Sequence, residues 1–270
     1  MASIIKVEHL SYVYNPGMPN AVTALDDVSF EVEEGDFVGI IGATGSGKST
    51  LITHMNGLNK PTGGKIIIDG TDITNLPEHK RAKYLGRVFQ DPMTGTVADM
   101  EIIENLAIAA RRGKKRGLSW GVKADERIRY RQMLAEFDLG LEDRMSSKVG
   151  LLSGGQRQAI TLLMATIKKP KLLLLDEHTA ALDPKTAAKV LELSDKIIAE
   201  NNLTALMVTH NMHDAITHGN RLIMMSDGKI ILDISGEEKK NLTVEHLLEM
   251  FEKASGSKLE NDRMLLSKDK

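Results

Sequence analysis

The stretch FVGIIGATGSGKST, which runs from Phe37 to Thr50, decides the fold of this chain. Its apolar first part predicts a buried strand, and its second part matches the pattern G-x-x-x-x-G-K-[ST] at every specified position. The glycines of such a loop let backbone N–H groups point at a polyphosphate, while the lysine adds positive charge and the next hydroxyl can bind Mg²⁺. A helix expected to begin near Lys48 adds the positive end of its dipole. The loop therefore predicts a nucleoside triphosphate site formed by Gly42, Ala43, Thr44, Gly45, Ser46, Gly47, Lys48, Ser49 and Thr50.

The composition is that of a folded protein with no strong electrostatic preference. The chain has 270 residues, enough for one large domain or two smaller lobes. Lys and Arg number 35 against 37 Asp and Glu, so the net charge is −2, and we expect no nucleic-acid partner. The absence of cysteine excludes disulfides, thiolate metal sites and cysteine nucleophiles.

We expect neither a membrane-spanning segment nor a secretion signal in this sequence. No apolar run approaches the roughly 18–20 residues that a membrane-spanning helix needs, and the first residues mix acid and base within a short β-like stretch. We therefore expect a chain that is kept in the cytoplasm. If it works at a membrane, it lies on the cytoplasmic face and another subunit must span the bilayer.

The hydrophobic pattern predicts an α/β fold. Alternating or apolar runs predict strands over Ile4–Val13 and Val28–Val32, and fully apolar strands over Leu172–Leu175 and Leu203–Val208. Because the last two alternate with amphipathic helical segments, they indicate a parallel sheet covered on both faces. An Asp-Gly turn is expected at residues 69–70 and a hairpin around residues 227–228. The helix after the phosphate loop should run through about residue 56 and be closed by Gly57; further helices are expected over residues 97–110 and 244–253, the last packing on the core. We expect a P-loop NTPase core with a mostly parallel sheet, an antiparallel β-rich N-terminal subdomain and an inserted α-helical subdomain. The expected parts are residues 1–90, 91–169, 170–235 and a C-terminal helix and tail over 236–270.

Two further segments add chemistry to the phosphate loop. The apolar strand ends in Asp176, placed to hold Mg²⁺, and Glu177, placed to polarise an attacking water as a general base. The sequence LSGGQ, residues 152–156, opens a helix expected over Arg157–Ile167 with Ser153 as its N-cap. This is a second anion-binding helix terminus beside a phosphate site that is already complete. It is therefore expected to close over the γ-phosphate held by another copy of the chain.

With these motifs in this order, the chain resembles the ATP-binding cassette (ABC) ATPases over about residues 4–235. The resemblance implies that ATP stacks on Tyr14 and that Gln90 senses Mg²⁺ and the γ-phosphate. It also implies that the loop carrying Asp183 crosses a dimer interface and that His210 is a switch residue contacting the γ-phosphate. It implies a head-to-tail dimer around two ATP-Mg²⁺, in which Ser153, Gly154, Gly155 and Gln156 serve the other chain's nucleotide.

One position departs from the family pattern. A proline usually follows the catalytic glutamate, whereas this chain has His178. Two interpretations stay open: the imidazole packs or hydrogen-bonds locally, or it tunes the base or the interface loop because it titrates near neutral pH.

The resemblance favours the energy-coupling subunit of a membrane transporter over other ABC ATPases. Chromosome-maintenance relatives need long coiled coils between the two ATP motifs, and translation-type relatives carry two cassettes. Export and lipoprotein release remain alternatives to uptake. Residues 111–121 and 151–183 resemble the importer branch for tryptophan- or tyrosine-type solutes. That likeness implies an integral membrane permease as partner and, through it, an extracytoplasmic solute-binding protein. The basic run Arg111–Gly117 is read as a solvated loop or as a contact for anionic lipid.

Overall fold

The computed structural model describes residues 3–113 and 121–255 and contains two β-sheets. The larger sheet has the strand order β10–β9–β3–β8–β7–β6. The neighbours β9, β3, β8, β7 and β6 are parallel, and β10 joins the edge antiparallel to β9. Its strands are β3 (Phe37–Gly42), β6 (Leu85–Val88), β7 (Leu172–Asp176), β8 (Ala205–Val208), β9 (Arg221–Ser226) and β10 (Lys229–Ser235). The predicted α/β fold with a mostly parallel sheet is confirmed.

The apolar runs of the sequence become strands that are buried on both faces. In β7, Leu173 and Leu175 pack with the helical part of the chain, whereas Leu172 and Leu174 pack against α1 and the smaller sheet. Successive side chains of a strand point to opposite faces, so a strand between two layers must be apolar throughout. The polar residues come only where β7 ends, at Asp176 and Glu177.

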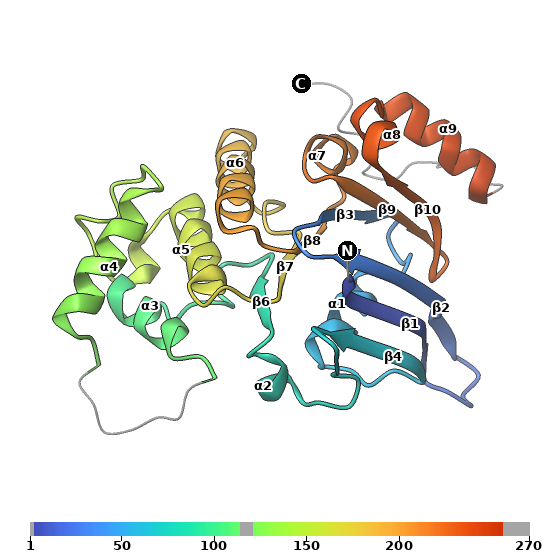
Figure 1. Ribbon diagram of the computed structural model, residues 1–270, viewed down its shortest axis with the longest axis horizontal. Coiled ribbons are helices and arrows are strands. Elements are labelled where there is room, and N and C mark those ends of the chain that lie inside the picture. The colour runs from blue at the N-terminus through green and yellow to red at the C-terminus, as the bar shows by residue number, and fades with distance from the viewer. Residues whose placement is uncertain (1–2, 114–120, 256–270) are drawn as a thin grey trace.

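The smaller sheet is antiparallel and has the order β2–β1–β4–β5. It comprises β1 (Ser3–Tyr14), β2 (Val22–Glu33), β4 (Gly63–Ile68) and β5 (Thr71–Asp72), with the predicted Asp-Gly turn between the last two. Figure 1 shows this sheet and the helix that follows the phosphate loop on one side of the molecule. The β-rich N-terminal part thus packs against the nucleotide-binding loop.

Helices cover the larger sheet and form a separate lobe. They are α1 (Lys48–Asn56), α2 (Glu78–Arg81), α3 (Ile102–Ala110), α4 (Ala124–Ala135), the 3-10 turn η1 (Val149–Leu151), α5 (Gly154–Thr166), α6 (Pro184–Asn201), α7 (Met212–Thr217), α8 (Gly236–Lys240) and α9 (Val244–Ser255). α1 ends at Asn56 with Gly57 in a left-handed conformation, as predicted. α3, α4 and α5 lie together at one end of the molecule, and α8 and α9 lie at the opposite upper corner (Figure 1).

Two predicted helices have different bounds in the structure. The helix expected over residues 97–110 begins only at Ile102, because the Asn105 side chain bonds both the N–H and the carbonyl of Val97 and holds that segment as a turn. The helix expected from Arg157 begins at Gly154, because Ser153 caps it there. The segment 114–120 and the polar tail 256–270 lie outside the described residues, so most of the basic run does too.

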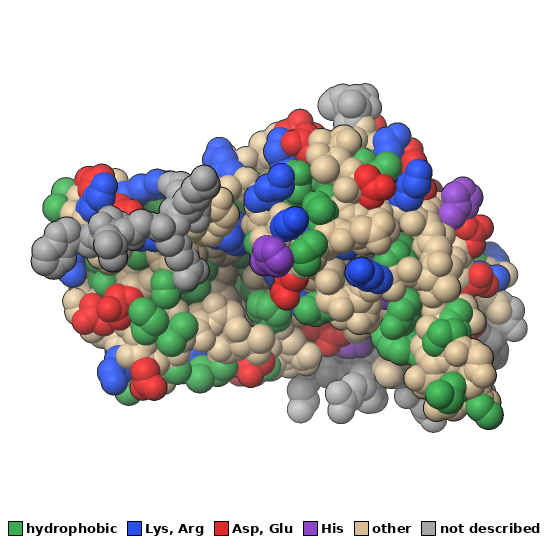
Figure 2. Space-filling model, turned by 90° about the horizontal axis from the view of Figure 1, so that it is seen from below, with side chains coloured by type: hydrophobic (Ala, Val, Ile, Leu, Met, Phe, Trp, Pro, Cys, Tyr) green, Lys and Arg blue, Asp and Glu red, His purple; other side chains and the backbone are tan. Residues whose placement is uncertain are grey.

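The C-terminal helix packs on the core as expected. Leu247 and Phe251 of α9 are buried against Met212 and Met224. None of the described helices combines the length and apolarity needed to cross a membrane. On the face shown in Figure 2, acidic and basic side chains lie interspersed, and hydrophobic side chains lie in small groups at both the left-hand and the right-hand end.

Candidate nucleotide site

The phosphate loop lies between the end of β3 and the start of α1. The Lys48 ammonium is buried and donates to the carbonyl oxygens of Gly42 at 2.6 Å and Ala43 at 2.9 Å. It also lies 3.4 Å from the Ser46 hydroxyl. The ammonium is therefore held inside the loop, at the N-terminus of α1. An anion bound there would be attracted by the ammonium and by the positive end of the helix dipole.

The backbone of this loop fits a phosphate group. Gly47 precedes α1 with a φ of 102°, and a Cβ there would lie 2.6 Å from the Ala24 carbonyl oxygen, so only glycine fits. No side chain caps α1 and its first turn has no acidic residue. A helix N-terminus without a capping or acidic side chain is suited to receive an external anion. Ser49, in the same turn, is exposed, as are Thr44 and Gly45 at the loop tip.

Tyr14, expected to stack on adenine, lies at the rim of this loop. Its ring is 40% exposed, and its hydroxyl lies 3.4 Å from Thr50 Oγ1 on α1. Tyr12 contacts the ring edge-on at 4.8 Å between centroids. One face of an aromatic side chain is thus presented beside the phosphate loop, as a stacking platform requires.

Glu177 and His210 meet at the ends of β7 and β8. His210 Nε2 lies 2.5 Å from Glu177 Oε1, and the glutamate side chain is only 13% exposed. Glu177 has a left-handed backbone, with φ of 48°, and its N–H donates to the Val208 carbonyl. A left-handed conformation at a residue other than glycine is uncommon and persists only where the surroundings hold it. Two of the side chains expected to take part in catalysis, Glu177 and His210, thus lie in contact.

Asp176 forms an ion pair that the sequence analysis did not anticipate. Arg87 Nη2 lies 2.7 Å from Asp176 Oδ2, with both side chains less than one-fifth exposed. The Arg87 guanidinium also lies over the Phe89 ring, 4.4 Å from its centroid. The pair forms because β6 runs parallel beside β7, a neighbourhood that the sequence does not show.

The residues expected to bind Mg²⁺ offer a hydroxyl, an amide and one carboxylate. Ser49 and Gln90 are exposed, and Asp176 is partly buried. Within residues 3–113 and 121–255, no three His, Cys, Asp or Glu side chains form a metal-binding group. Mg²⁺ prefers oxygen ligands, keeps several of its waters and also binds the phosphates of a nucleotide, so it fits this set of three donors. The donors therefore fit Mg²⁺ brought in with the triphosphate, rather than a cation held by protein alone.

The signature segment forms the N-terminus of α5. Ser153 Oγ accepts from Gln156 N–H and Gln156 Oε1 accepts from Ser153 N–H, which is a capping box. A Cβ on Gly155 would lie 2.2 Å from Thr186 Cγ2, so the lack of a side chain lets α5 approach α6 closely. Gly154 faces Leu182 in the same way. Figure 1 shows α5 and α1 on opposite sides of β6 and β7, so this terminus lies away from the chain's own phosphate loop.

The Asp183 loop and the Gln90 loop are both tied to neighbouring helices. Asp183 caps α6, and hydrogen bonds from Thr186 hold the pKa of its carboxyl below the usual value. Gln158 of α5 is fully buried, and its Nε2 donates to the carbonyl of Phe89, next to Gln90. The sequence analysis missed Gln158, although it lies two residues beyond the signature.

His178 is buried behind the site. It is 2% exposed, and its Nε2 lies 3.1 Å from Ser194 Oγ on α6. Burial lowers the pKa of His178 to about 4, with the nearby His218 acting in the same direction and Asp195 opposing it. The imidazole is therefore neutral at physiological pH. Of the two interpretations left open by the sequence, local hydrogen bonding fits the structure, and tuning through titration near neutral pH does not.

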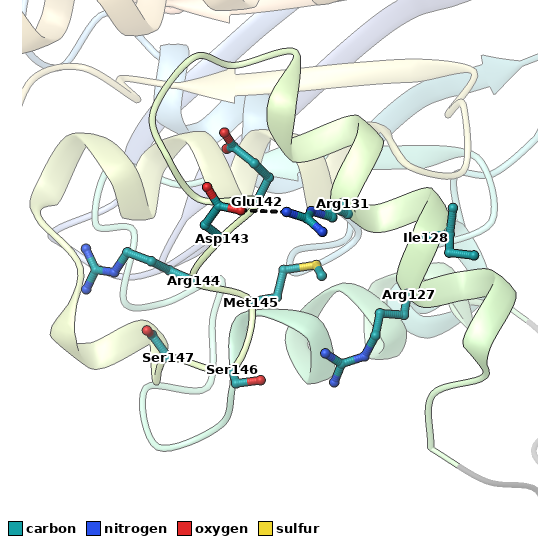
Figure 3. Close-up of a pocket in the computed structure, with 9 residues that line it drawn as sticks. All are labelled: Arg127, Ile128, Arg131, Glu142, Asp143, Arg144, Met145, Ser146 and Ser147. Atoms are coloured by element: carbon teal, nitrogen blue, oxygen red, sulfur yellow. Dashed lines mark hydrogen bonds and ion pairs between the residues drawn. The ribbon is translucent and has the colours of Figure 1, made fainter.

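Two hollows accompany these residues. One, of about 230 Å³, is lined by Glu177, Thr179, Thr209, His210 and neighbouring residues, and lies at the catalytic pair. The other, of about 540 Å³, lies in the helical lobe between α4 and residues 142–147 (Figure 3). Figure 3 shows Arg131 turned toward Asp143 across it, with Met145 at its floor. Basic and apolar side chains thus share the second hollow.

Comparison with known proteins agrees with this arrangement. The family model "ABC transporter" matches residues 25–180. The chain is similar to a tyrosine transport ATP-binding protein of Clostridioides difficile, with 47% identity over 253 residues, 93% of this chain and all of that protein. It is also similar to the crystal structure of an ATP-binding cassette of an ABC transporter in its ADP conformation, with a TM-score of 0.76, 29% identity and 93% and 99% of the two chains covered. A dimeric cassette in a post-hydrolysis state with ADP and Pi gives a TM-score of 0.70 at 30% identity, covering 86% and 98%.

Proposed function

The chain belongs to the ABC transporter family, and we propose that it closes as a head-to-tail dimer on two ATP molecules to drive uptake of an amino-acid-like solute. It is the ATP-hydrolysing, ATP-binding subunit of such a transporter. The observation that carries the proposal is the junction of β7 and β8, where His210 Nε2 and Glu177 Oε1 are in ion-pair contact.

In the proposed site, the phosphate loop binds and orients the triphosphate. The N–H groups of the loop and of the first turn of α1 receive the phosphates, and Lys48 turns from the loop carbonyls to the β- and γ-phosphates. Tyr14 stacks on the adenine base. Ser49, Asp176 and Gln90 would hold Mg²⁺, which when bound neutralises charge on the β- and γ-phosphate oxygens.

Glu177 is the proposed general base. A carboxylate in a partly dry site can accept a proton from an attacking water if it is held at the correct position. Its left-handed backbone and its ion-pair contact with His210 supply that positioning. Loss of the His210 contact would let the carboxylate rotate within the adjoining hollow.

The second half of each site would come from another copy of the chain. Ser153, Gly154, Gly155 and Gln156 form an anion-binding helix terminus that lies away from the chain's own phosphate loop. A second copy turned head to tail would place this terminus over the γ-phosphate. Binding of ATP would then favour a closed dimer and hydrolysis would favour opening, which is a ligand-shifted equilibrium.

The proposed membrane partner is an integral permease that contacts the helical lobe. Residues 91–169 would form this lobe, inserted between residues 1–90 and 170–235 of the core, with 236–270 appended. Large apolar side chains are exposed on it, namely Met93, Val97, Ile108, Ile128 and Leu151. Arginines line the hollow of Figure 3 beside Ile128. Exposed apolar side chains bordered by charge are typical of a protein interface. Such a contact would hold the chain at the cytoplasmic face of the membrane.

The solute is proposed from similarity to the tyrosine transport ATP-binding protein. Its delivery by an extracytoplasmic binding protein is proposed from the resemblance of the sequence to the importer branch. The test is co-purification of the tagged chain from membranes, followed by ATPase assay of the complex with aromatic amino acids. Recovery of a permease and stimulation of ATP hydrolysis by a substrate-loaded binding protein would support the proposal. A chain recovered without any membrane protein would contradict it.

A further inference from the structure

His178 is a buried imidazole with no part in the chemistry proposed above. The segment from Asp176 to Lys189 is described throughout, and His178 is its one buried residue. Everything else in the segment, including Glu177 and Asp183, is partly or fully exposed. The side chain of His178 is thus the anchor by which this turn is fastened to the protein.

The hydrogen bond that holds His178 has a defined direction. Ser194 Oγ donates its single proton to the carbonyl of Val190 at 2.8 Å, within α6. The hydroxyl can therefore only accept from the imidazole, whose Nε2 lies 3.1 Å away. This assigns the Nε2–H tautomer to His178 and makes the bond an N–H donor to a hydroxyl acceptor. Both side chains are at least 98% buried, so breaking the bond leaves a buried polar group without its partner.

The helix that receives this bond also begins at the loop expected to cross the dimer interface. α6 starts with Asp183 as its N-cap, and its first turn lies against the glycines of the signature helix through Thr186. Ser194 lies three turns further along the same helix. A movement of the Asp183 loop that shifts α6 would therefore shift the acceptor of the His178 bond.

Glu177 needs such an anchor because its backbone is strained. Its φ of 48° is in the left-handed region, and its N–H and C=O are bonded to Val208 and Ala180. These backbone hydrogen bonds fix the peptide units of the turn. The side chain of the next residue, His178, determines how the turn packs against α6. A strained residue at a catalytic position keeps its geometry only if neighbouring groups determine it.

We propose that His178 is a positioning residue, whose Nε2–H bond to Ser194 fastens the Glu177 turn to α6 and so links the catalytic carboxylate to the Asp183 loop. The inference rests on the role proposed for Glu177. It differs from a packing role because it requires the donor atom and not just the volume of the imidazole. A proline at this position, as in most of the family, could make no such bond.

The test compares variants that separate the hydrogen-bond donor of His178 from the volume of its side chain. His178→Gln keeps an N–H donor near the position of Nε2, His178→Leu keeps the volume without it, and Ser194→Ala removes the acceptor. Thr166→Val is the matched control, since Thr166 is a buried helical hydroxyl that bonds only the backbone of α5. Steady-state ATP hydrolysis, the Kd for ATP-Mg²⁺ and the melting temperature are measured on the full chain, with Glu177→Gln in parallel.

A misplaced base lowers the rate of the chemical step without weakening nucleotide binding. We expect His178→Leu and Ser194→Ala to lower kcat about ten- to a hundredfold, with KM and Kd within about twofold of the unaltered chain. His178→Gln should recover most of kcat, and Thr166→Val should leave kcat unchanged. Equal kcat for the Gln and Leu variants, or an unaltered kcat in Ser194→Ala, would overturn the inference.

Parallel measurement of Glu177→Gln distinguishes the two ways of failing. If Glu177→Gln abolishes hydrolysis while Ser194→Ala hydrolyses normally, the link to α6 is wrong and the base assignment stands. If Glu177→Gln hydrolyses normally, the proposed role of Glu177 fails and the inference fails with it.

Discussion

Substitution His210→Ala tests the contact at the centre of the site. His210 Nε2 lies 2.5 Å from Glu177 Oε1, and the glutamate side chain is 13% exposed, so water cannot fully replace the lost partner. If His210 donates to the carboxylate when the site is assembled, such a hydrogen bond to a charged group contributes about 1.5–3 kcal/mol. If that contribution is retained in the transition state, its loss lowers kcat about 13- to 160-fold, at about 1.36 kcal/mol per factor of ten.

The assay is steady-state phosphate release by the full chain at saturating ATP-Mg²⁺. KM for ATP should change much less than kcat, because the bond orients the base rather than the nucleotide. His213→Ala is the control: His213 is an exposed neighbour whose Nδ1 lies 3.4 Å from the Thr217 hydroxyl. A kcat for His210→Ala within about twofold of the control would refute the reasoning.

Three further predictions follow from other contacts. Lys48→Ala should abolish binding of ATP, measured by isothermal titration calorimetry, whereas Lys189→Ala on the exposed side of α6 should not; retained micromolar affinity in Lys48→Ala would remove the phosphate-loop assignment. Arg87→Met should destabilise the nucleotide-free chain by about 1–3 kcal/mol, since it leaves the partly buried Asp176 carboxylate unpaired. Arg131→Met breaks an exposed pair and should cost no more than about 1 kcal/mol, so equal melting temperatures for the two variants would contradict the prediction. For His178, a pKa lowered from 6.5 to about 4 means that the unfolded chain binds the proton first as the pH falls. The free energy of unfolding should therefore have its full value above about pH 6.5 and fall by about 3 kcal/mol as the pH is lowered to about 4. His178→Gln should remove this part of the pH dependence, measured by chemical denaturation at a series of pH values.

The sequence predicted the elements whose patterns are local. The phosphate loop, the capped end of α1 at Gly57, the apolar strand before Asp176 and the hairpin around Asp227 and Gly228 are all where the motifs placed them. Each depends on residues that adjoin in the chain: turn glycines, a cap, or a short apolar run with polar ends. Local chemistry of this kind is readable without knowing the neighbours in space.

The features that were missed depend on contacts between distant segments. Arg87 meets Asp176 only because β6 and β7 are neighbours in the sheet, and the late start of α3 depends on the Asn105 side chain folding back to Val97. His178 was noticed as a departure from the family, but its burial against Ser194 could not be read from the sequence. Its depressed pKa follows from that burial.

The most direct test of the account is the oligomeric state of Glu177→Gln with ATP-Mg²⁺, measured by light scattering after size-exclusion chromatography. If each nucleotide is held between the phosphate loop of one chain and Ser153–Gln156 of another, the variant should bind ATP, fail to hydrolyse it and elute as a dimer. The same variant without nucleotide should elute as a monomer, and adding Ser153→Arg should prevent the ATP-dependent dimer. A variant that binds ATP with full occupancy and yet stays monomeric at micromolar concentrations would contradict the proposed shared site.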